Sequence, residues 1–185
     1  MIRDAADNAV RNAPGHPAPK QGYPPMASLT HVGLTVLGVR AVMDWYVDIL
    51  GFEVVLPPQK NIHNGSLAGD VVKDMFGDGF EGLETCMLRS ANGACLELIR
   101  FITPASEQRE DKFEYWRTGL FHICVAERDI DALITRILDA GGKQISAVWP
   151  LYKDQPYRAA YCADPWGNIL EVFSHDTVET FANQA

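Results

Sequence analysis

The 185-residue sequence lacks the features that mark several common classes of protein. No apolar run approaches the about 20 residues that span a bilayer, and residues 1–28 hold no apolar segment typical of a secretory signal. Basic residues are few, since 16 Lys and Arg stand against 24 Asp and Glu, and they form no stripe. With a net charge of −8, we expect a cytoplasmic protein that binds neither nucleic acid nor membrane.

Paired cysteine motifs are also missing. The four cysteines form no CxxC pattern, and each lies in an apolar segment with the composition of a strand: Cys86, Cys95, Cys124 and Cys162. Free cysteines in such segments typically act as small buried side chains in a reducing compartment. We therefore expect structural thiols; a nucleophilic cysteine is the alternative, and no motif supports it.

The N-terminal part differs in composition from the rest of the chain. Residues 1–27 hold five prolines among Gly, Asn, Asp and Lys, so they can bury little apolar surface. We expect a flexible extension there, a first unit over 28–103, a linker over 104–119, a second unit over 120–175 and a C-terminal tail over 176–185.

The two units repeat one pattern. Each opens with a strand-like segment around a histidine, at 29–37 and 120–126, and continues into an amphipathic helix, at 39–50 and 130–140. A glycine follows 20 residues after each histidine, at Gly51 after His31 and at Gly142 after His122. The pattern predicts an α+β protein built from two βαβββ units.

Each unit ends in a predicted hairpin with the same spacing. The turn glycine precedes a glutamate by four residues, from Gly93 to Glu97 and from Gly167 to Glu171. The histidine-to-glutamate distance is 66 residues in the first unit and 49 in the second, so the first holds 17 additional residues. We place them within 57–80 and expect an elaborated loop near a ligand site.

The histidine and glutamate of each unit occupy its first and last strands. Side chains alternate along a strand, so His31 faces away from Val32 and Leu34, and both glutamates face away from their apolar neighbours. A single strand histidine or glutamate is ordinarily a hydrogen-bonded or solvated residue, but a carboxylate within an apolar strand is costly unless paired or metal-bound. Two imidazoles and two carboxylates at equivalent positions favour one divalent ion (Zn, Ni, Co, Mn or Fe(II)).

Several segments together resemble the vicinal-oxygen-chelate superfamily, which includes glyoxalases, bleomycin-resistance proteins and dioxygenases. They are LTHVGLTV, LGFEVV, ACLELIRF, FHICV and DPWGNILEVF, and the resemblance spans nearly all of residues 29–175. It implies two paired units that form a curved, open mixed sheet around a metal site, in a protein that is a homodimer. The 25 residues from Glu97 to His122 form a long link between the units, which favours a site within one chain. Carried over from glyoxalase I, the metal ligands are His31, Glu97, His122 and Glu171.

The presence of Glu97 favours one branch of that superfamily. Methylmalonyl-CoA epimerase is similar but has glutamine at this place, extradiol dioxygenases have no ligand there, and the antibiotic binders usually lack the set. The resemblance therefore implies an isomerase, epimerase or lyase whose metal chelates a small carbonyl substrate and stabilises an enediolate. An Fe(II) extradiol-type dioxygenase and a non-catalytic small-molecule binder remain the alternatives.

Three residues are candidates for roles beyond metal binding. In glyoxalase I-like enzymes the last ligand can act as the base, which points to Glu171. If residues 91 and 92 form a two-residue turn, Glu84 shares the face of Glu97 and is a second candidate base; a solvated glutamate is the alternative. The same register in the second unit places Arg158 beside Glu171, where it could bind a substrate anion or remain solvated.

Overall fold

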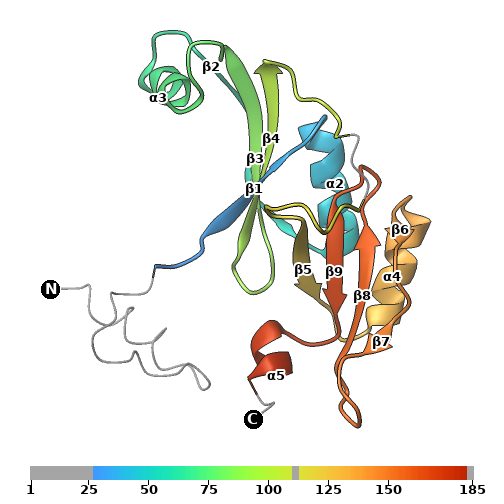
Figure 1. Cartoon of the computed structure of the whole chain (residues 1–185). Coiled ribbons are helices and arrows are strands. Elements are labelled where there is room, and N and C mark those ends of the chain that lie inside the picture. The colour runs from blue at the N-terminus through green and yellow to red at the C-terminus, as the bar shows by residue number, and fades with distance from the viewer. Residues whose placement is uncertain (1–26, 110–112, 183–185) are drawn as a thin grey trace, which may run out of the picture.

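The computed structural model of the chain describes residues 27–109 and 113–182. The predicted N-terminal extension lies outside these residues except for its last position. The described part forms two curved mixed sheets with helices packed against them (Figure 1). No helix within the described ranges combines the length and the apolar character needed to cross a membrane.

The first unit forms a four-stranded sheet of order β1-β4-β3-β2, in which β1 and β4 are parallel and the other neighbours antiparallel. Its elements are β1 (His31–Thr35), α2 (Val39–Leu50), β2 (Glu53–Ile62), α3 (Leu67–Phe76), β3 (Gly82–Arg89) and β4 (Cys95–Thr103).

The second unit repeats this arrangement with the order β5-β9-β8-β6, while the short strand β7 also pairs with β8. Its elements are β5 (His122–Ala126), α4 (Ile130–Asp139), β6 (Lys143–Gln144), β7 (Trp149–Pro150), β8 (Arg158–Ala163) and β9 (Ile169–Phe173), followed by α5 (Thr177–Phe181). The prediction of an α+β fold from two βαβββ units is confirmed.

Local sequence explains where the two main helices begin and end. Helix α2 ends at Gly51, whose φ of 70° is left-handed and suits glycine. Helix α4 begins after Asp129, whose side chain accepts a hydrogen bond from the amide of Ala132 and so caps the helix. Both helices bury one apolar side, as their spacing predicts; the buried residues of α4 are Ile130, Leu133, Ile134 and Ile137.

The two units share one hydrophobic core. It includes residues of α2, α4 and both sheets, and Figure 1 shows α2 between the first sheet and the second. Among the described residues, three long-range hydrogen bonds join α2 to the second unit. The indole of Trp45 donates to the carbonyl of Ala140 (3.1 Å), the hydroxyl of Tyr46 donates to Asp164 (3.2 Å), and Nε of Arg136 donates to the carbonyl of Ile49 (3.5 Å). The helix-bearing faces of both sheets therefore point toward a common interior.

The additional residues of the first unit do not form a loop. They extend β2 and add α3, which lies at the far end of the first sheet (Figure 1). Ser66 caps α3 through its hydroxyl, and the helix approaches β2 so closely that a Cβ at Gly69 would lie 2.7 Å from the carbonyl oxygen of Ile62. The predicted C-terminal tail likewise contains a helix, α5.

Candidate functional site

The four predicted metal ligands lie on the faces that strand alternation predicts. In β4, the neighbours of Glu97 are Leu96 and Leu98, which are buried in the core. In β9, Glu171 stands between the equally buried Leu170 and Val172. Because neighbouring residues of a strand point to opposite faces, both glutamates face away from the core.

The first pair joins β1 and β4. The Nε2 atom of His31 lies 3.6 Å from Oε2 of Glu97. The hydroxyl oxygen of Thr30 is 3.3 Å from Nδ1 of the same imidazole, so the two ring nitrogens have different neighbours. The other carboxylate oxygen of Glu97 accepts a hydrogen bond from the hydroxyl of the buried Thr85 (3.0 Å).

The second pair joins β5 and β9. Nε2 of His122 lies 3.2 Å from Oε2 of Glu171, and both side chains are more buried than those of the first pair. Nδ1 of His122 is buried and has no hydrogen-bond partner within the described part of the chain. An imidazole whose Nδ1 is enclosed presents Nε2 to an ion or to the carboxylate.

Two further side chains surround Glu171. Burial, together with the hydrogen bond and charge of Glu171, raises the pKa of Tyr161 to about 12. Burial also raises the pKa of Cys124 to about 12, and the charge of Glu171 contributes. Both groups therefore stay protonated at neutral pH and can donate to the carboxylate.

The four cysteines are free, but they do not all match the expectation of burial. Cys86 and Cys162 are buried in the core, and burial raises the pKa of each thiol to about 11. Cys95 is half-buried, and Cys124 lies on the exposed side of β5 beside Glu171. The alternation that turns Glu171 away from the core does the same for Cys124.

The two histidine–glutamate pairs do not form one cluster. Among the described residues, no group of three or more His, Cys, Asp or Glu side chains is placed to hold a metal ion. The shared core explains this separation. In each sheet the helix packs on one face and the histidine–glutamate pair lies on the other. Because the helix-bearing faces meet in the common core, the two faces with the pairs point outward. The chain thus carries two half-sites, each with one imidazole and one carboxylate.

The geometry of each half-site suits a divalent ion. Imidazole nitrogen and carboxylate oxygen bind Zn²⁺ at about 2.0–2.2 Å, so two such ligands of a tetrahedral ion lie about 3.3–3.6 Å apart. The separations of 3.6 Å and 3.2 Å are close to this range. Two ligands alone leave most of a coordination sphere open, whereas the two half-sites together supply the four groups of a tetrahedral site.

The predicted strand registers were wrong by one residue in both hairpins. Glu97 pairs with Met87, and Glu171 pairs with Tyr161. Each turn contains three residues and ends in a left-handed glycine, Gly93 (φ 89°) or Gly167 (φ 91°), and a three-residue turn shifts the pairing relative to a two-residue turn.

This shift changes which side chains accompany the ligands. It places Thr85 and Tyr161 on the faces that carry the glutamates. Neither residue was predicted to belong to the site. The signal that could have found them is the glycine at the third position of each turn, which favours the three-residue hairpin over the two-residue one.

The same shift removes Glu84 and Arg158 from the faces predicted for them. Glu84 shares the face of the buried Cys86 and lies 3.6 Å from Arg100. Arg158 forms an ion pair with Asp131 of α4 at 2.8 Å. Neither lies on the face of the glutamate that it was predicted to accompany.

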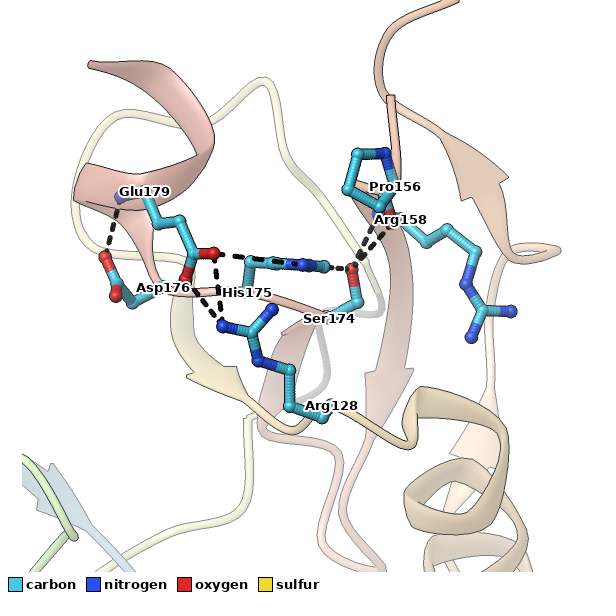
Figure 2. A network of polar contacts seen from close by, with 7 residues as sticks. All are labelled: Arg128, Pro156, Arg158, Ser174, His175, Asp176 and Glu179. Atoms are coloured by element: carbon cyan, nitrogen blue, oxygen red, sulfur yellow. Dashed lines mark hydrogen bonds and ion pairs between the residues drawn. The ribbon is translucent and has the colours of Figure 1, made fainter. Parts of the chain in front are cut away.

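A polar network near Arg158 holds the C-terminal helix (Figure 2). Oγ of Ser174 lies 2.8 Å from Nδ1 of His175, whose Nε2 is 4.0 Å from Glu179. The order of groups is that of a serine hydrolase, but Ser174 is 3% exposed and its oxygen accepts the backbone N–H of Arg158. Figure 2 shows Arg128 joining the network through Glu179 of α5, so this cluster fastens α5 rather than forming a nucleophilic site.

A cavity of about 380 Å³ lies between β1, the linker and the start of β5. His122 is the one predicted ligand on its wall, beside Phe113, Phe121 and Trp166. The aromatic rings of Phe113, Phe121 and Tyr161 also contact one another, with centroid distances of 5.5–6.3 Å. The second half-site is therefore bordered by an aromatic wall.

Comparisons with known proteins agree with this fold. A sequence model described as the Glyoxalase/Bleomycin resistance protein/Dioxygenase superfamily matches residues 28–172. A 2-epi-5-epi-valiolone epimerase from Actinomyces sp is 23% identical over 168 residues, which are 89% of this chain and 88% of that protein.

Two solved structures are similar in fold. A glyoxalase family protein from Bacillus cereus has a TM-score of 0.66 at 19% identity, covering 82% of this chain and 96% of that one. Glyoxalase I from Zea mays has a TM-score of 0.53 at 19% identity, covering 80% of this chain and 44% of the maize chain.

Proposed function

This chain belongs to the glyoxalase/bleomycin resistance protein/dioxygenase superfamily, and on that premise we propose that it is a metal-dependent isomerase, epimerase or lyase. The observation that carries the proposal is the presence of two equivalent histidine–glutamate pairs, His31 with Glu97 and His122 with Glu171. Their donor atoms and spacing suit one divalent ion (Zn, Ni, Co, Mn or Fe(II)). The similarity to an epimerase supports a reaction that removes and returns a proton.

The complete centre is formed by two copies of the chain. One protomer supplies His31 and Glu97, and its partner supplies His122 and Glu171. The strands that carry the histidines, β1 and β5, are the end strands of their sheets, so within the described residues each has one edge that pairs with no other strand and could meet a second copy. The outward direction of the two faces favours this homodimer over closure within one chain, which would disrupt the shared core.

The residues of the centre have distinct roles. When bound, the ion supplies a Lewis acid that polarises the carbonyl of a small oxygenated substrate. Both imidazoles present Nε2 to the centre. Glu97 is held by the hydroxyl of Thr85 and serves as a ligand, while Glu171 accepts and returns the proton next to the carbonyl.

Exchange of substrate protons with deuterated water tests this function. The purified protein is analysed for bound metal and then incubated with carbonyl compounds, including 2-epi-5-epi-valiolone, in the presence of each divalent ion. We expect metal-dependent deuterium incorporation, a large loss in Glu171→Gln and loss of metal in Glu97→Ala. Glu84→Gln is the matched control, since its carboxylate lies on the opposite face.

Three outcomes would contradict the proposal. Full metal occupancy in the Glu97→Ala variant would exclude Glu97 as an essential metal ligand. Metal-free protein that binds the compounds without exchange would favour a small-molecule binder. Oxygen uptake with catechols after anaerobic loading with Fe(II) would favour a dioxygenase.

Mixing two inactive variants tests the shared centre. His31→Ala and His122→Ala each damage both sites of their own homodimer. In a mixed dimer, one site carries both substitutions and the other is intact, so random exchange of subunits restores about a quarter of the sites. A centre confined to one chain would give no recovery on mixing.

A further inference from the structure

The two candidate ligand carboxylates lie beside hydroxyl groups of different kinds. The hydroxyl of Thr85, a buried residue on β3, donates a hydrogen bond to Oε1 of Glu97 at 3.0 Å. Since Oε2 faces His31, both oxygens of Glu97 have a defined neighbour. A carboxylate held in this way has little freedom to turn.

Glu171 lies opposite a different donor. Tyr161 is its direct cross-strand partner in the β8–β9 pairing, so the two side chains leave the same face of the sheet next to each other. The phenol ring is fixed in the aromatic wall, 5.5 Å from the ring of Phe113, and it meets the imidazole of His122 at 5.7 Å, edge to face. The hydroxyl is thus placed by packing that does not depend on the carboxylate.

A glutamate that acts both as a metal ligand and as a base, as proposed for Glu171, requires a hydroxyl partner such as that of Tyr161. While it carries the substrate proton, Glu171 interacts less strongly with the ion, and a hydroxyl that can both donate and accept suits either protonation state of the carboxyl group. The two hydroxyls therefore have different roles. Thr85 beside Glu97 helps to retain the metal, and Tyr161 beside Glu171 orients the base.

We propose that Tyr161 is a positioning residue that orients Glu171 for proton transfer, while Thr85 holds Glu97 as a fixed ligand. This inference rests on the proposed function and assigns separate effects to two hydroxyls. Outer hydroxyl partners of this kind typically contribute about 10- to 100-fold in activity or metal affinity.

The experiment compares Tyr161→Phe with Thr85→Val. The phenylalanine keeps the ring in the aromatic wall, and valine keeps the volume of threonine, so each substitution removes one hydroxyl. For Tyr161→Phe we expect kcat for proton exchange to fall about tenfold or more, with KM and the Kd for metal close to wild type. For Thr85→Val we expect a Kd for metal raised by about tenfold or more, with kcat close to wild type at saturating metal.

Tyr115→Phe is the control for loss of a tyrosine hydroxyl, because Tyr115 is 61% exposed. A wild-type kcat in Tyr161→Phe would overturn the inference and leave the proposed function intact. Parallel losses of metal affinity in both variants would overturn the division of tasks. Wild-type protein that neither binds metal nor exchanges protons would refute the proposed function as well, and metal binding by Tyr161→Phe reports independently that this variant is folded.

Discussion

Replacing Tyr46 with phenylalanine should destabilise the protein by removing a buried hydrogen bond between its two units. The ring is fully buried in α2, and its hydroxyl donates to Oδ2 of Asp164 in the second unit. Phenylalanine keeps the ring contacts with Trp45 and Phe52, so the substitution removes the hydroxyl and little packing.

The expected loss is about 1.5–3 kcal/mol at neutral pH, the range for hydrogen bonds to charged groups. Asp164 is 2% exposed and also accepts hydrogen bonds from Asn168 and from the backbone of Trp166. Those bonds remain in the variant, which keeps the loss below that of an unpaired buried charge.

The pH dependence has a definite sign. Burial raises the pKa of Asp164 above its usual 3.8, and the hydrogen bonds from Asn168, Tyr46 and Trp166 offset part of this rise. A raised pKa means that the folded state disfavours the ionised form of Asp164. The free-energy cost of this ionised carboxylate is present at a pH above its pKa in the folded state, and it disappears as the pH falls below that pKa. Removing the Tyr46 hydroxyl raises the pKa further, so the destabilisation should be largest at neutral pH and decrease on acidification.

Urea unfolding across this pH range measures the effect. Tyr115→Phe provides the control and should change the free energy of unfolding by less than about 0.5 kcal/mol, as exposed substitutions do. An unchanged free energy of unfolding in Tyr46→Phe at neutral pH, or a loss that increases on acidification, would contradict the role assigned to the hydrogen bond with Asp164.

Three further predictions concern other parts of the molecule. Gly142→Ala should destabilise the protein by about 1–3 kcal/mol in a thermal melt, because the added Cβ would lie 2.7 Å from the carbonyl oxygen of Ala163; an unchanged melting temperature would contradict this contact. In the metal-free protein, Cys124 should react slowly with iodoacetamide at neutral pH, because burial and the charge of Glu171 raise the pKa of its thiol to about 12. Glu171→Gln should speed the reaction by removing the contribution of the charge; peptide mass spectrometry measures both rates, and equal rates would contradict a contribution from Glu171. Ser66→Ala should destabilise α3 by about 1 kcal/mol through loss of its cap, seen as faster amide hydrogen exchange confined to that helix.

Local patterns predicted much of the fold. The helix spacing from Val39 to Leu50 and the glycine that ends it specify α2, because side-chain periodicity and left-handed backbone are properties of the chain itself. Alternation in the strands likewise placed both glutamates on faces opposite the core. The repeated spacing then indicated which histidine accompanies which glutamate, and both pairs are found in contact.

The register of each hairpin depends on its turn type, and the sequence is compatible with more than one turn type. A two-residue and a three-residue hairpin both fit the segment around Gly93, but only the latter places Thr85 beside Glu97. One residue of difference exchanges the two faces of a strand, so a small error in the turn moved Glu84 and Arg158 to the wrong side.

The two half-sites can be predicted from the sequence alone, because each depends on the strands of one repeat and on the alternation of side chains along them. The position of one half-site relative to the other is a property of the tertiary structure, since it depends on which surfaces of the two units pack together. Burial of α2 and α4 in one shared core turns the histidine–glutamate faces outward, and this packing is a sum of contacts distant in sequence. The partners of the carboxylates, Thr85 and Tyr161, were also decided at that level, because cross-strand pairing selects them.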